Sequence, residues 1–181
     1  MTLRFTALIL ILSMMVACEP VEEPGLQKAV DEVRIPSQES WNPTIRINSV
    51  GKETVQAQSD YSAHYDKPRE IIFIGDVTLD FFNPEGEHSS TMSADTGRID
   101  DQRHLFTATG NVYVESDSGA TLTTSILYWN ENDESIYTDA SIVLTTETDT
   151  LHGVGFESDS NLENWTITQP TGVSYREFDS E

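Results

Sequence analysis

From Trp41 onward, apolar and polar residues alternate with a period of two, and helical spacing is nearly absent. Ile45 and Ile47 alternate with Arg46 and Asn48, for example, and Thr, Val, Ile, Tyr and Phe dominate such runs. Turn-forming residues separate the runs, at 49–52, 83–86, 117–119 and 130–133. The pattern predicts an all-β domain of antiparallel strands.

These expected strands also repeat, with a unit of about thirty residues. Residues 73–79 align with 108–114 and with 138–144, and each copy is followed by a turn and a second strand, while 55–65 form a partial copy. Gly75, Gly110 and the small Ala140 recur at the same point inside a strand, where glycine marks a bend or a bulge. A ribbon that bends at every repeat would fold into two facing sheets, stacked into an elongated body with open edges at both ends.

The apolar positions of these strands share one face. An ordinary sandwich core would explain that alternation, but faces that repeat in register would also form a continuous apolar groove. We interpret them as a groove for lipid chains. Its expected lining residues are Phe73, Val77, Leu79, Phe81, Met92, Phe106, Val112, Val114, Leu122, Ile142 and Leu144.

The N-terminus has the features of a processing signal. Arg4 precedes an apolar run, 5–16, of about a dozen residues, which is too short to span a bilayer core of ~30 Å. The run closes on residues 15–18, Met-Val-Ala-Cys, which resemble a bacterial lipobox. Cys18 is the only cysteine, so it forms no internal disulfide, and we expect it to carry a diacylglycerol. A secretory signal with an incidental cysteine is the alternative.

The chain therefore divides into four expected parts. These are a lipoprotein signal peptide, 1–17, a lipidated N-terminus with a flexible, proline-containing tether, 18–40, the β domain, 41–178, and a short acidic tail, 179–181. We expect the folded part to be exported and held at a membrane.

Charge narrows the possible partners. The chain has 10 basic and 31 acidic residues, a formal charge of -21. Binding to nucleic acid or to anionic headgroups needs clustered Lys and Arg, so both are disfavoured. The acidic surface is typical of a protein that stays soluble without self-association.

No motif for catalysis, metal binding or cofactor binding is present in the sequence. The four histidines are dispersed and indicate surface positions. The acidic segment 130–134 could bind calcium, although a solvated hairpin tip accounts for it as well and is the favoured interpretation. A carbohydrate hydrolase using two of the many carboxylates is the enzyme alternative; we expect no enzyme, no cofactor and no metal.

Several segments, in their order and spacing, resemble the LptC family, the periplasmic component of the lipopolysaccharide export machine. The resemblance covers about Trp41 to Phe178. It is carried by the segments at 40–42, 75–77, 80–83, 86–88, 94–97, 110–112, 127–129, 136–139 and 153–158.

The resemblance implies an antiparallel, twisted β-jellyroll that is open along one side. It also implies a function: the protein would receive lipopolysaccharide from the inner-membrane ABC transporter and pass it to an LptA-like bridge protein. Jellyrolls of this kind join edge to edge, here through strands near 41–48 and 165–175. The edge residues would be Trp41, Ile45, Ile47, Trp165, Ile167 and Tyr175.

The resemblance has one departure. Well-known family members keep a transmembrane helix, whereas this chain would carry lipidated Cys18 instead. We expect anchoring at the periplasmic face of the inner membrane, although Glu19 after the cysteine is compatible with the outer membrane as well. The alternative function is an LptA-like or other jellyroll lipid-binding lipoprotein that is not attached to the transporter.

Overall fold

The computed structural model describes residues 34–49 and 52–171, and its strands belong to one compact unit, Ile35–Glu181. The expected signal peptide, Cys18, most of the tether and Tyr175 lie outside the described residues. All regular elements in the described ranges are strands, which confirms the predicted all-β class. They are β1 (Gln38–Trp41), β2 (Thr44–Ser49), β3 (Lys52–Gln58), β4 (Tyr61–Asp66), β5 (Arg69–Phe82), β6 (His88–Asp100), β7 (Leu105–Ser116), β8 (Thr121–Asn130), β9 (Ser135–Thr145), β10 (Thr150–Asp159) and β11 (Trp165–Pro170).

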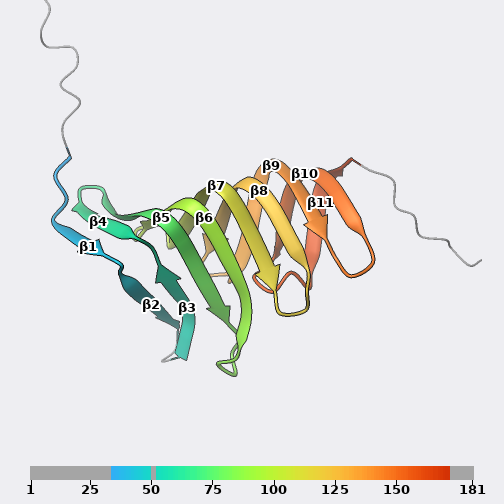
Figure 1. Cartoon of the computed structure of the whole chain (residues 1–181), viewed down its shortest axis with the longest axis horizontal. Helices are drawn as coiled ribbons and strands as arrows, with labels where there is room; N and C mark the ends of the chain where they lie inside the picture. Colours follow the sequence, from blue (N-terminus) through green and yellow to red (C-terminus); the bar gives the residue numbers. More distant parts are fainter. Residues whose placement is uncertain (1–33, 50–51, 172–181) are drawn as a thin grey trace, which may run out of the picture. The chain divides into compact units, whose positions relative to one another are not determined.

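The strands form one antiparallel sheet in nearly sequential order (Figure 1). From β5 to β11 each strand pairs with the next along the chain. Before β5 there are two short pairs of strands: β4 pairs with the beginning of β5 and β3 with its end. β1 pairs with β4, and β2 with β3. The domain boundary predicted at Trp41 falls at the end of β1, which begins at Gln38, because Gln38 to Trp41 pair in register with β4.

The two expected facing sheets are two parts of this single sheet, which bends across the middle of each long strand. The register shifts between Ile74 and Val77 in β5 and between Thr109 and Val112 in β7. Gly75 and Gly110 lie inside these bends with φ of 77° and 80°, a region that costs glycine little. The predicted bends at both glycines are therefore confirmed.

We call the two parts of the folded sheet leaf one and leaf two. Leaf one holds β1, β4, β5 up to Ile74, β6 from Thr96, β7 up to Thr109, β8 from Ile126, β9 up to Thr138 and β10 from Phe156; leaf two holds β2, β3 and the remaining parts of β5 to β10. The turns between strands lie at the far ends of the leaves, opposite the bends.

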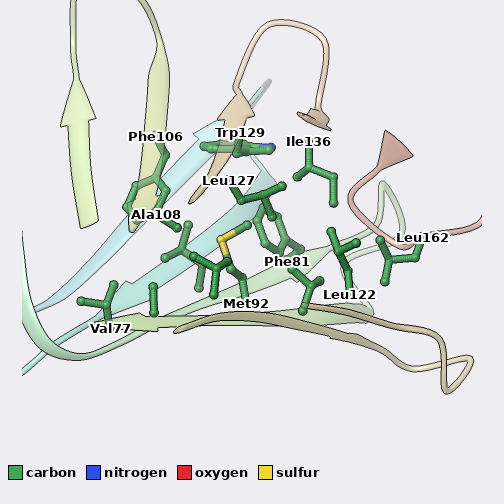
Figure 2. Packing of buried hydrophobic residues seen from close by; sticks show 14 of the residues in the cluster. Val77, Phe81, Met92, Phe106, Ala108, Leu122, Leu127, Trp129, Ile136 and Leu162 are labelled. Carbon is green, nitrogen blue, oxygen red and sulfur yellow. The ribbon is translucent and has the colours of Figure 1, made fainter. Parts of the chain in front are cut away.

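The hydrophobic core lies between the leaves (Figure 2). Phe81 of leaf two and Trp129 of leaf one meet there edge to face, with ring centroids 5.7 Å apart. Phe73 and Phe106 pack on each other within leaf one, at 6.1 Å. Aromatic contacts of this kind add to the stabilisation from area burial, so the two leaves are held together mainly by their apolar inner faces.

Candidate functional site

All eleven residues expected to line the groove lie on the inner face of the folded sheet. Each is at most 3% exposed, and each belongs to the single cluster of buried apolar side chains. Their side chains pack on one another in the structure. Contact of these residues with lipid stays a prediction.

Strand pairing explains why these residues share a face. In β5, β7 and β9 the bend leaves the alternation in phase, so Phe73 and Leu79 point inward from opposite sides of the bend, as do Phe106 and Val114. In β6, β8 and β10 the bend shifts the alternation by one residue. On β8, inward positions change from Leu122 before the bend to odd-numbered residues after it.

This phase shift accounts for inner-face residues that the sequence analysis missed. The missed residues that lie after a bend are Leu127, Trp129 and Phe156. Further buried residues were missed for reasons other than the phase shift. They are Ala94, Ala108 and Ile136 in the long strands, Val55 and Ala57 in β3, and Leu162 in a loop. The alternation of Leu127 and Trp129 with Tyr128 and Asn130 was a usable signal, because a bend in β7 must also bend β8, the strand paired with it.

The inner face reaches the surface at both ends of the sheet. Ile45, Ile47 and Ile71 are partly exposed while packing on the cluster at the N-terminal end, and Leu151 and Ile167 do so at the C-terminal end. Partly exposed apolar side chains at opposite ends of one core are suited to continuing that core into a neighbouring protein.

The two ends also carry the unpaired strand edges. Within the described residues, β1 pairs only with β4, β2 only with β3, and β11 only with β10. Each edge therefore offers free backbone N–H and C=O groups. Of the expected edge residues, Trp41 is 70% exposed on β1 and Trp165 is 36% exposed on β11.

Trp41 is held in place by a neighbouring tyrosine. Its ring meets that of Tyr61 with centroids 5.8 Å apart, and the Tyr61 hydroxyl donates a hydrogen bond to the Glu39 carboxylate, also on β1. This hydrogen bond, together with burial and the charge of Glu39, raises the pKa of Tyr61 to about 12. The contacts tie the outermost strand to β4 through side chains as well as backbone.

The candidate metal segment is a hairpin tip. Asn130 donates through Nδ2 to Asp133 Oδ2 at 2.8 Å and accepts from the Asn132 amide through Oδ1 at 2.9 Å. In the part of the chain that the structure describes, no group of three or more His, Cys, Asp or Glu side chains could hold a metal ion. Two histidines lie beside carboxylates, His88 beside Asp117 and His104 beside Glu131.

Comparison with known proteins identifies the family. A family model described as LptC, lipopolysaccharide-assembly, LptC-related, matches residues 5–175. No curated protein gives a significant match. The chain is similar to the crystal structure of LptH, the LptA homologous periplasmic component of the conserved lipopolysaccharide transport device from Pseudomonas aeruginosa. The two are 16% identical, and the alignment covers 67% of this chain and 90% of that one with a TM-score of 0.47.

No helix in the described ranges has the length and apolar character needed to cross a bilayer. The family match extends over nearly the whole sequence and includes every described strand. With that extent of agreement, the chain belongs to the LptC family of lipopolysaccharide-assembly proteins.

Proposed function

We propose that this protein carries lipopolysaccharide from the inner-membrane ABC transporter to an LptA-like bridge protein, with the acyl chains between the two leaves. The observation that carries the proposal is the single apolar cluster that runs through the folded sheet and emerges at both ends. The family match supports it. The protein acts as a conduit, and no chemical step is assigned to its own residues.

The physical need for such a conduit is large. Moving one buried methylene into water costs ~0.8 kcal/mol, so exposing one long acyl chain costs on the order of 10 kcal/mol. A lipid with several chains therefore cannot cross an aqueous gap unaided at a useful rate. It can move along a continuous apolar face while its sugar and phosphate headgroup stays in water. The net charge of -21 then poses no obstacle, because the acidic surface need not bind the headgroup.

We assign the N-terminal edge, β1 and β2, to the transporter and the C-terminal edge, β11, to the bridge protein. Both edges are unpaired on one side within the described residues, so either can accept a strand from a partner. The half-buried Ile47 and Ile167 lie at these ends, and both would contact lipid as it passes from one jellyroll to the next.

A crosslinking experiment with matched neighbours tests the lipid path. A photo-reactive residue replaces Ile47 or Ile167, which pack on the apolar cluster, or their exposed neighbours Arg46 or Thr166. In membranes that contain the complete transporter, ATP should produce lipopolysaccharide adducts at the two isoleucine positions and few at the neighbours. Adducts at Ile47 should precede those at Ile167.

The outcomes separate the possible functions. Absence of adducts at both inner positions, with the protein folded and bound to the transporter, rules out the conduit. Adducts that form equally without ATP favour a lipid-binding scaffold that is not attached to the transporter. Reversal of the order of labelling overturns our assignment of the two edges.

The membrane anchor needs its own test, because Cys18 lies outside the described residues. We propose that a diacylglycerol on Cys18 holds the protein at the periplasmic face of the inner membrane. Metabolic labelling with a fatty-acid analogue should mark the wild-type protein and not Cys18→Ser. Labelling that persists in the variant contradicts the anchor, and fractionation into the outer membrane contradicts the location.

A further inference from the structure

The loop between β10 and β11, residues 160–164, inserts one side chain into the apolar cluster. Leu162 is 2% exposed, and Figure 2 shows it among the buried residues at the end of the cluster that Leu122 and Ile136 also occupy. Among the described residues it is the only large side chain of the cluster that comes from a loop; the others lie in strands, apart from the small Ala120. A strand residue cannot leave the cluster without breaking the sheet, whereas a loop residue can.

The same loop joins the two leaves across their open side. It leaves leaf one at Asp159, which pairs with Ser135. The hydroxyl of Ser90, a fully buried residue of leaf two, donates to the carbonyl oxygen of Ser160 over 2.6 Å. A hollow of about 260 Å³, lined partly by Ser160 and Asn161, marks the place where the loop meets the β5–β6 and β8–β9 turns. The loop therefore covers the part of the open side that lies beside these two turns.

The shape of the loop is preset, and its closed position is strained. The Asp159 carboxylate accepts hydrogen bonds from the backbone amides of Glu163 and Asn164, at 2.9 and 3.2 Å. Leu162 has φ of 59°, which is uncommon for a residue with a side chain. The buried Oδ1 of Asn161 has no hydrogen-bond partner among the described residues. The buried position of Leu162 therefore comes with two unfavourable features, the positive φ and the unpaired Asn161 oxygen. Segments with such features open more readily than the strands around them.

From this geometry we propose that residues 160–164 form a lid, and that Leu162 occupies the place that an acyl chain of the lipid takes when the lid opens. This proposal rests on the proposed function and names a place between the leaves that the acyl chains occupy as they pass through the protein. In the closed state the inner face is filled by its own side chains. Incoming hydrocarbon displaces Leu162 and breaks the contact between Ser90 and Ser160, while the strand pairing of both leaves persists.

Two variants should open the lid, and a third provides the matched control. Leu162→Ala removes the inserted side chain, and Ser90→Ala removes the hydrogen bond to the loop. Leu105→Ala makes the same truncation in strand β7, at a half-buried position that is not part of the apolar cluster. Uptake of purified lipopolysaccharide by the full-length protein in detergent micelles should speed up about tenfold or more for Leu162→Ala and by a few-fold for Ser90→Ala. Leu105→Ala should leave the rate of uptake unchanged.

Hydrogen exchange supplies the second measurement. In the full-length wild-type protein, lipopolysaccharide should increase exchange of amides in 160–164 while β8 and β9 stay protected. If the lipid binds and the loop stays as protected as before, or if Leu162→Ala and Leu105→Ala change uptake equally, the lid is wrong and the conduit stands. If lipopolysaccharide is not taken up by the wild-type protein or by any variant, both proposals fall.

Discussion

Replacing Gly110 with alanine should destabilise the fold far more than the same change at Gly119. Both glycines have positive φ, 80° and 86°, so alanine carries a similar backbone penalty of about 1–2 kcal/mol at each. Alanine also restricts the unfolded chain equally at both positions, which offsets roughly 0.4–1 kcal/mol of that penalty. The two positions differ in what the new methyl group meets.

At Gly119, in the β7–β8 turn, nothing lies within 4 Å of the place where a Cβ would stand. At Gly110 that Cβ would clash with Asp95 Oδ2 and would stand 3.0 Å from Asp95 Cβ. Rotating the carboxylate away would not relieve the second contact, so β6 itself must move, at a cost of about 1–3 kcal/mol. The move also weakens the 2.8 Å hydrogen bond from Asn111 Nδ2 to Asp95, about another 1 kcal/mol.

The expected loss of unfolding free energy is thus about 1 kcal/mol for Gly119→Ala and about 3–4 kcal/mol for Gly110→Ala. Urea denaturation measures both, followed by the emission of Trp129, which is buried between the leaves. In an Asp95→Gly background, which removes both contacting atoms, Gly110→Ala should cost no more than Gly119→Ala. Equal losses for the two single variants would falsify the claim that close approach of β6 and β7 fixes the bend.

Two further changes probe the repeats and the outermost strand. Asp76 holds the place in its repeat that Asn111 holds in the next repeat, and their φ values are 40° and 44°. Asp76→Asn should therefore add a hydrogen-bond donor like the one that Asn111 offers Asp95, and we expect about 1 kcal/mol of added stability in urea denaturation. A loss of stability would count against equivalent bends in the two repeats. Glu39→Gln should lower the pKa of Tyr61 from about 12 toward 10, as seen by ultraviolet titration. Because that pKa is raised in the folded state, the contribution of Tyr61 to stability is present below pH 10 and is lost as the pH rises toward 12.

Local chemistry in the sequence was enough to predict the strands, their repeat and the bends at Gly75 and Gly110. Glycine weakens an otherwise β-branched strand unless the chain bends there, and the positive φ at both positions agrees with a bend. The same reasoning could not follow the alternation through β6, β8 and β10. There the bend shifts the inward face by one residue, so Trp129 and Phe156 lie on the inner face although the sequence analysis did not include them.

Several features depend on contacts between distant parts of the chain, and no local pattern reveals them. Leu162 lies in a polar loop, and only the folding of one leaf over the other brings it into the cluster. The hydrogen bond from Ser90 to Ser160 joins residues 70 positions apart. The single continuous sheet, in place of two separate ones, arises because the same strands pair on both sides of each bend, across the register shifts.

The filled interior has a consequence for a protein that must release what it carries. A permanently open apolar groove would gain the full burial energy of each acyl chain, on the order of 10 kcal/mol, and would hold its lipid too tightly to pass it on. When the leaves instead pack on each other in the free protein, an entering chain must first break apolar contacts that already exist, and this cost lowers the net gain from burying the chain. If the protein carries lipid as proposed, the groove residues would serve as the core without lipid and as the wall of the groove with it. The cost of separating the leaves would weaken the hold on each chain, so a smaller push from the transporter would suffice to pass the chain on.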